Sequence, residues 1–297
     1  MKTRFSIKVP ATTANIGSGF DCAGIALKLY NDFIFDFSRE KGLEFFGVDG
    51  RFATEDNLVY QTFSEILIAK DIAIPTDFYL EMVTNIPVAR GLGSSSTCII
   101  AGIMAANIYG ELNLKLADML QMATKIEGHP DNIAPAILGG MVLAVALDEE
   151  VLYKKIIPAN MYTFIVIIED NEVSTADARA VMPKMISYDD AVFNISRAGL
   201  LLEAFQTGDA KLLKVVTQDR IHQAHRAKLI KCYEGLQPVL ASKLFTTSWV
   251  SGSGSTQVAL SLKQQACEAV AAILAVSPEL CVLALDVEVD MPLIEML

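Results

Sequence analysis

Residues 86–97 form a run rich in glycine and serine that reads Ile86-Pro87-Val88-Ala89-Arg90-Gly91-Leu92-Gly93-Ser94-Ser95-Ser96-Thr97. Residues 78–84 before it alternate like a strand, and the apolar residues 98–109 after it are long enough for a buried helix. A loop that enters a helix N-terminus offers free backbone N–H groups and the positive end of the helix dipole to an anion. Glycines let the backbone approach a phosphate closely. The run therefore predicts an anion site.

This run differs from two well-known phosphate loops. No lysine follows its last glycine, as the Walker sequence requires, and its glycines are not spaced as Gly-x-Gly-x-x-Gly. Without that lysine, the charge of a phosphate must be offset by N–H groups and a metal. Serine and threonine are also favoured as helix N-caps where no ligand binds, so the run alone leaves a plain N-cap open.

Composition limits the partners that this chain can have. The 297 residues carry a net charge of −11, which argues against nucleic acid, because binding to its backbone needs many Lys and Arg. The longest weakly polar runs, residues 98–108 and 134–147, contain glycines and fall short of the ~20 apolar residues of a membrane-spanning helix. Residues 1–7 alternate like a strand and lack the apolar stretch of a signal peptide. We therefore expect a cytoplasmic protein that binds neither nucleic acid nor membrane.

Strand-like and helix-like segments are mixed without strict alternation, which predicts an α+β fold. Strands are expected at residues 4–10, 27–37, 78–84, 141–147 and 162–168. Helices are expected at residues 57–70, 98–109, 116–127, 176–182, 189–207, 209–217 and 263–276. A boundary near residue 155 divides the chain into two predicted domains, residues 1–155 and 156–297.

The twelve positions 86–97 resemble the signature of the GHMP kinases, a family of ATP-dependent small-molecule kinases. The resemblance implies a ribosomal-S5-like N-terminal half that binds ATP and a ferredoxin-like C-terminal half. It implies that Pro87 to Thr97 hold ATP, with the loop N–H groups on its phosphates, and that Ser95 is a Mg²⁺ ligand. Residues Asn57-Leu58-Val59-Tyr60 similarly resemble the border of the adenine pocket.

Several chemically active side chains follow the helix predicted at residues 116–127, in the sequence Glu127-Gly128-His129-Pro130-Asp131-Asn132. ATP transfer needs a hard oxygen ligand for Mg²⁺, and Glu127 is the candidate. A C-cap at Gly128 and a helix stop at Pro130 would explain the same residues structurally. The resemblance implies that Glu127 and Ser95 share the metal, while His129, Asp131 and Asn132 face the substrate.

Residues 10–21 resemble the first motif of the GHMP kinases that act on L-homoserine. A plain turn would explain half of these residues. The resemblance assigns the substrate ammonium to Asp21 and polar groups of the substrate to Asn15.

Two arginines match positions that bind the substrate carboxylate in this branch of the family. Arg179 follows Thr175 in a segment that also reads as a capping box, and both would contact the substrate. Arg226 matches the second of these positions. An arginine suits a carboxylate because its guanidinium donates two parallel hydrogen bonds. For its neighbours Arg220, His222 and His225 we expect a solvated helix face.

Gly252 lies in the sequence Ser251-Gly252-Ser253-Gly254-Ser255, between two strand-like segments. Such a position predicts a hairpin turn. The sequence also resembles the third motif of the family, which approaches the substrate and the phosphates, and the resemblance makes Gly252 a substrate contact.

The resemblance implies ATP-dependent phosphorylation of the L-homoserine side-chain hydroxyl to O-phospho-L-homoserine, a step of threonine biosynthesis. Membership of the family also implies a homodimer. The expected catalytic residues are Asn132, Asp131 and Arg179, without a dedicated carboxylate base, since Asn132 stands where other branches place an Asp. Effects of His129→Ala and Asp131→Ala should then be separable. A GHMP kinase for threonine or a mevalonate-type substrate and an inactive nucleotide-binding regulator are the alternatives.

Overall fold

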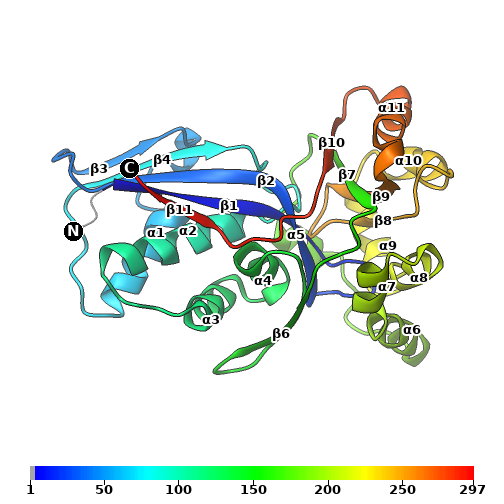
Figure 1. Cartoon of the computed structure of the whole chain (residues 1–297), viewed down its shortest axis with the longest axis horizontal. Coiled ribbons are helices and arrows are strands. Elements are labelled where there is room, and N and C mark those ends of the chain that lie inside the picture. Colours follow the sequence, from blue (N-terminus) through cyan, green and yellow to red (C-terminus); the bar gives the residue numbers. More distant parts are fainter. Residues whose placement is uncertain (1–3) are drawn as a thin grey trace.

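The computed structural model describes residues 4–297, and residues 1–3 of the alternating start lie outside the described residues. Over the described range the chain forms a seven-stranded and a four-stranded sheet with helices packed on them (Figure 1). This mixture confirms the α+β class. No helix within residues 4–297 has the length and apolar character needed to cross a membrane.

The first sheet runs in the order β11-β1-β2-β4-β3, and β5 and β6 extend it from β2. Four helices cover one of its faces (Figure 1). Phe5 and Ile7 of one strand stand opposite Phe35 and Phe33 of the next, so alternate residues point into the core between sheet and helices. The strands are β1 (Arg4–Ala14), β2 (Ala23–Asp36), β3 (Leu43–Phe46), β4 (Phe78–Thr84), β5 (Met141–Ala146), β6 (Val151–Ile156) and β11 (Leu293–Met296). The helices are α1 (Leu58–Ile68), α2 (Ser94–Tyr109), α3 (Leu116–Glu127) and α4 (Pro130–Leu138).

The second sheet is antiparallel in the order β10-β7-β9-β8. Strand β7 is buried along its whole length, because helices cover both faces of the sheet. Phe164 and Val166 face α7 and α8, and Ile165 and Ile167 face α10 and α11. The strands are β7 (Tyr162–Ile168), β8 (Thr247–Val250), β9 (Gln257–Leu262) and β10 (Cys281–Leu285). The helices are α5 (Thr175–Ala180), α6 (Tyr188–Ala198), α7 (Leu201–Thr207), α8 (Ala210–Val216), α9 (Gln223–Arg226), α10 (Tyr233–Leu240) and α11 (Ala266–Val276).

One predicted helix was wrong in its extent. The helix expected over residues 189–207 is broken at Gly199 and Leu200 into α6 and α7. The alternative of a C-cap at Gly128 is confirmed, since α3 ends at Glu127 and Gly128 is in the left-handed conformation. Pro130 follows this helix end and also begins α4, where its missing N–H is no loss because the first helical residue has no partner within the helix. The hairpin predicted around Gly252 is confirmed, since β8 and β9 pair antiparallel on either side of it.

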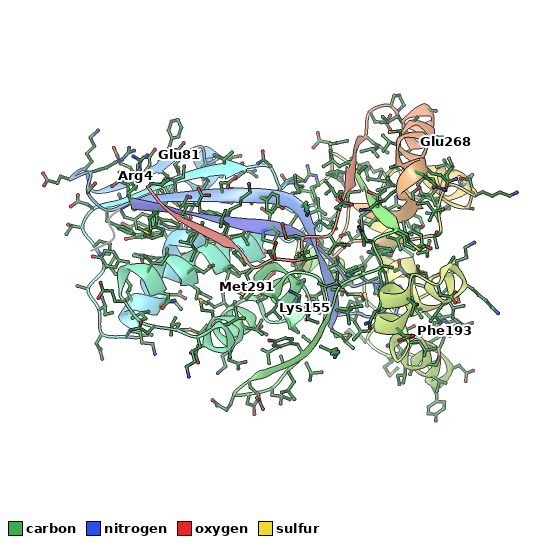
Figure 2. All side chains as sticks on the ribbon, viewed as in Figure 1. Arg4, Glu81, Lys155, Phe193, Glu268 and Met291 are labelled. Carbon is green, nitrogen blue, oxygen red and sulfur yellow. The ribbon has the colours of Figure 1, made fainter. Side chains whose placement is uncertain are left out.

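The two sheets share one apolar cluster, which draws Ala11 and Ile25 from the first half and Phe164 and Trp249 from the second. Strand β11 crosses from the second half to pair with β1. Lys155, labelled in Figure 2, donates to carbonyl oxygens of Leu138 and Val289 at 2.5 and 2.8 Å. The division at residue 155, inside β6, stays a prediction.

Candidate active site

A cleft of about 420 Å³ opens beside the glycine-serine loop and collects residues from both halves of the chain. The predicted site residues that line it are Asn15, Asp21, Val88, Ala89, Arg90, Gly91, Leu92, Gly93, Ser94, Ser95, Glu127, His129, Asn132, Thr175, Arg179, Arg226 and Gly252. Pro87, Ser96, Thr97 and Asp131 are not among the lining residues. The fold thus brings the separate motifs of the sequence to one place.

The glycine-serine loop takes a backbone conformation that requires glycine at two positions. Gly91 and Gly93 have φ of 74° and 71°. A Cβ on Gly91 would lie 2.1 Å from the carbonyl O of Ser251, and one on Gly93 would lie 2.1 Å from Oγ1 of Thr12. Gly93 is the N-cap of α2, so the alternative of a Ser or Thr N-cap is wrong. The helix begins without a side-chain cap, which leaves its first N–H groups for another acceptor.

Two serine hydroxyls at the start of α2 meet the carboxylate at the end of α3. Ser95 Oγ and Ser96 Oγ each donate to Glu127 Oε1 at 3.1 Å. Burial raises the pKa of Glu127, although the charge of His129 and the two hydroxyls oppose the shift. The exposed Ser95 lines the cleft, whereas Ser96 is fully buried.

The pair Ser95 and Glu127 fits a Mg²⁺ ion. Both offer hard oxygens, and two neighbouring ligands of an octahedral Mg²⁺ lie about 2.9 Å apart, close to the 3.1 Å between Ser95 Oγ and Glu127 Oε1. Among residues 4–297 no group of three or more His, Cys, Asp or Glu is placed to hold a metal. Mg²⁺ usually needs no such cage, since waters and substrate phosphates supply most of its ligands.

His129, Asp131 and Asn132 form a connected polar group. His129 Nδ1 lies 2.5 Å from Asp131 Oδ1, and Asn132 Nδ2 lies 3.4 Å from the same oxygen. Thr12 Oγ1 donates to Asn132 Oδ1 at 2.7 Å. Burial lowers the pKa of His129, but the hydrogen bond and charge of Asp131 outweigh it and leave that pKa raised. Asp131 is fully buried behind His129, so any effect on a substrate would run through His129 and Asn132.

The other end of the cleft is charged. Arg179 donates from Nη1 and Nη2 to the two carboxylate oxygens of Asp21, both at 3.1 Å. Asn15 Oδ1 accepts from the backbone N–H of Asp21 at 2.8 Å, in a turn where both residues have positive φ. Arg226 is 2% exposed and donates to the carbonyl O of Gly252 at 2.5 Å. Burial lowers the pKa of Arg226, and the charge of Asp21 opposes that shift.

Of the four residues expected at the border of the adenine pocket, Asn57 and Leu58 line the cleft and Val59 and Tyr60 are not among its lining residues, and sequence reasoning missed other residues around them. Asn57 is the N-cap of α1, and its amide donates to the carbonyl O of Phe52 at 2.9 Å, which fixes the preceding loop. The missed residues come from five separate stretches of the sequence, at positions 48–52, 82–84, 98, 173–174 and 253, and no motif spacing marks them. The lining residues missed are Val48, Asp49, Arg51, Phe52, Met82, Thr84, Cys98, Val173, Ser174 and Ser253.

The solvated helix face expected for Arg220, His222 and His225 is wrong for His222. Arg220 is exposed, but His222 is fully buried. Its ring packs on Phe20 of the first motif, a contact between residues about two hundred positions apart that a local pattern cannot show.

Comparisons with known proteins agree on one family. Residues 57–140 match the family model described as GHMP kinases N terminal domain. A homoserine kinase of Clostridium beijerinckii is 42% identical over 255 residues, which cover 86% of this chain and 85% of that protein. A homoserine kinase of Clostridium botulinum is 40% identical over 84% of each chain.

A solved structure of a homoserine kinase also matches this chain. The crystal structure of homoserine kinase from Cytophaga hutchinsonii superposes with a TM-score of 0.87 at 27% identity, and covers 99% of this chain and 98% of that one. The chain therefore belongs to the GHMP kinases, and within them to the homoserine kinases.

Proposed function

We propose that this chain transfers the γ-phosphoryl group of ATP to the side-chain hydroxyl of L-homoserine and forms O-phospho-L-homoserine, a step of threonine biosynthesis. The observation that carries the proposal is the pairing of two kinds of subsite in one cleft. A lysine-free glycine loop with Ser95 and Glu127 suits a metal-bound nucleotide. Beside it, Asp21, Arg179 and Arg226 suit a molecule that carries one ammonium and one carboxylate.

The charged end accounts for recognition of the amino acid. Asp21 and Arg179 already pair with each other, so a zwitterion can enter between them and give each an opposite charge. In this proposal Asp21 and Asn15 receive the ammonium, and Arg179 and the buried Arg226 receive the carboxylate. Thr175, Gly252, His129 and Asn132 complete the lining around the substrate.

The chemistry requires positioning more than a strong base, because phosphoryl transfer passes through a loose transition state. Asn132, held by Thr12, orients the substrate hydroxyl, and Asp131 fixes the His129 ring beside it. Arg179 holds the substrate while the substrate hydroxyl attacks the γ-phosphoryl group of ATP in line. The loop from Pro87 to Thr97 holds the phosphates, and Ser95 and Glu127 hold Mg²⁺, which offsets phosphate charge when bound.

We also propose that the reaction takes place in the cytoplasm. A cytoplasmic enzyme has direct access to ATP and free amino acids. The homodimer stays an expectation at the level of the family.

A substrate panel tests the proposal. ADP release is measured with L-homoserine, L-threonine, L-serine and mevalonate at equal ATP and Mg²⁺ concentrations. We expect the highest kcat/KM with L-homoserine, since mevalonate lacks the ammonium that suits Asp21. A higher value for another acceptor would assign the chain to that substrate, and absence of turnover with all four would favour a nucleotide-binding regulator.

A further inference from the structure

The first motif is tied to α9 by aromatic contacts that the proposed function does not use. The ring of Phe20 stacks on the ring of His222, with centroids 5.0 Å apart and an angle of 25° between the planes. The same Phe20 ring lies against the guanidinium of Arg226, whose Cζ is 4.9 Å from the ring centroid. His222 is the N-cap of α9, and Arg226, four residues further on, is the last residue of that helix. Phe20 therefore contacts both of them at once.

The first motif holds the His222 ring in place. This ring is fully buried, and Nε2 donates to the carbonyl O of Gly17 at 2.9 Å. Burial lowers the pKa of His222 even though Asp219 opposes the shift, so the ring is neutral and its one N–H points at Gly17. Ser18 adds a bond from Oγ to the carbonyl O of Val216 at 2.9 Å.

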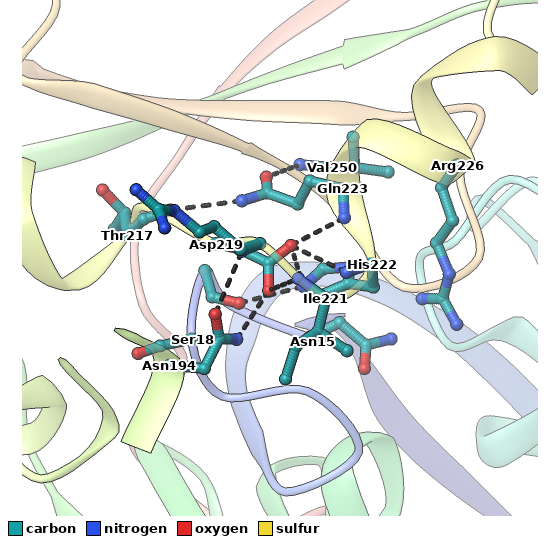
Figure 3. A network of polar contacts seen from close by, with 12 residues as sticks. Asn15, Ser18, Asn194, Thr217, Asp219, Ile221, His222, Gln223, Arg226 and Val250 are labelled. Carbon is teal, nitrogen blue, oxygen red and sulfur yellow. Dashed lines mark hydrogen bonds and ion pairs between the residues drawn. The ribbon is translucent and has the colours of Figure 1, made fainter. Parts of the chain in front are cut away.

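A second set of hydrogen bonds, made by Asp219 and Gln223, fixes the start of α9. The carboxylate of Asp219 accepts the backbone N–H groups of His222 and Gln223, both at 2.8 Å, and the side-chain amide of Asn194 at 2.7 Å. Gln223 Oε1 accepts the N–H of Val250 at 3.0 Å, which joins the helix to β8. Figure 3 shows Asp219 at the centre of this network and Arg226 projecting away from it.

The contacts of Phe20 and His222 connect Asp21 with Arg226, two charged residues proposed to bind the ammonium and the carboxylate of the amino acid. Asp21 follows Phe20 directly in the chain, and Arg226 lies against the Phe20 ring. We propose that Phe20 and His222 are positioning residues that hold Asp21 and Arg226 at the separation which the ammonium and the carboxylate of one α-amino acid require. Since the two charges bind the substrate only under the proposed function, the inference rests on that function.

The test compares Phe20→Leu, which keeps an apolar side chain but removes the aromatic face, with Phe20→Tyr as the matched control. For each variant kcat and the KM values for L-homoserine and ATP are measured. The inhibition constant of 3-aminopropan-1-ol against L-homoserine is measured as well. This amine carries the ammonium and the hydroxyl of homoserine but no carboxylate, so it does not use Arg226.

In Phe20→Leu we expect the KM for L-homoserine to rise about tenfold, as loss of a desolvated cation–π contact predicts. The KM for ATP and the inhibition constant of 3-aminopropan-1-ol should stay within about twofold of the wild-type values. Phe20→Tyr should behave like the wild type. A general distortion of the site would instead weaken both the amino acid and the amine.

Two results would overturn the proposal: an unchanged KM for L-homoserine, or equal weakening of L-homoserine and 3-aminopropan-1-ol. A melting curve without ligand is recorded for each variant, and His222→Gln, which keeps an N–H donor for Gly17, replaces Phe20→Leu if that variant does not fold. Wild-type turnover of L-homoserine is measured first. Its absence would count against the proposed function and not against the positioning role.

Discussion

Among single residues, Ser95 and Ser96 make the same bond to Glu127 but differ in exposure. Both hydroxyls lie 3.1 Å from Oε1 of the carboxylate, yet Ser95 lines the cleft and Ser96 is buried under it. A metal ligand must reach the substrate phosphates, so the two serines should differ in function although they look alike in sequence.

Ser95→Ala should raise the Mg²⁺ concentration for half-maximal activity by about 10- to 100-fold, because it removes one of the two oxygens proposed to hold the ion. Ser96→Ala is the matched control and should change that concentration by less than about threefold. Activity is titrated with Mg²⁺ at fixed ATP. Equal effects of the two substitutions would contradict the assignment of Ser95 as a ligand.

The contact between His129 and Asp131 revises the expectation that substitutions at these residues act separately. Their side chains lie 2.5 Å apart, and residues in direct contact show coupled effects. The loss of kcat in the double variant His129→Ala with Asp131→Ala should therefore be clearly smaller than the product of the two single losses. If the double variant loses kcat by the full product of the two single losses, the two residues act independently and the coupling is contradicted.

The same contact predicts how stability depends on pH. The pKa of His129 is raised in the folded chain, so the stabilisation by its charged form is complete below the ordinary value of about 6.5 and is lost as pH rises through the folded pKa. The melting temperature of the wild type should exceed that of His129→Gln most at about pH 6, and the difference should shrink towards about pH 8.5. A difference that stays constant over this range would contradict the raised pKa.

Among the elements, the glycine-serine loop and the β8–β9 connection approach each other so closely that neither can carry a larger residue there. A Cβ on Gly91 would meet the carbonyl O atoms of Ser251 and Gly254 at 2.1 and 2.9 Å. Ser251 Oγ also donates to the carbonyl O of Gly91 at 2.7 Å. The two loops therefore form one wall of the cleft.

Gly91→Ala should destabilise the fold by about 1–3 kcal/mol more than Gly42→Ala, because only the first adds a backbone clash. Gly42 is a matched control, since its φ of 76° is close to the 74° of Gly91 and no atom lies within 4 Å of a Cβ built there. Denaturant unfolding gives both free energies. Similar losses would show that the two loops separate easily.

The sequence predicted the elements whose pattern is local and the motifs whose chemistry is specific. Strands β1, β2, β4, β5 and β7 and helices α1 to α3 follow from alternation and helical spacing. Helix α4 was missed because Pro130 can start a helix as well as stop one. The burial of His222 could not be predicted, since it depends on Phe20 and Gly17, which only the tertiary fold brings to it.

Over the whole molecule, the two halves are joined by a common core and by crossing strands. Trp249 of the second sheet packs in the cluster that contains Ala11 and Ile25, and its Nε1 donates to Thr13 Oγ1 at 2.9 Å. Strand β11 pairs with β1. The halves should therefore be strongly coupled in unfolding.

The chain should unfold in one transition despite its two sheets. Trp249 is the only tryptophan in the sequence, so its fluorescence reports on the junction, while circular dichroism reports on all helices. We expect the two denaturant curves to share one midpoint. Separate midpoints would mean that the halves unfold independently and that the shared cluster contributes little.

The whole arrangement predicts one product. Wild-type protein is incubated with ATP, Mg²⁺ and L-homoserine, and the products are identified by ³¹P NMR and mass spectrometry. We predict a new phosphate monoester on the side-chain oxygen of homoserine, formed in equal amount with ADP. Release of ADP without that monoester, or no reaction at all, would contradict the assignment of this cleft to L-homoserine phosphorylation.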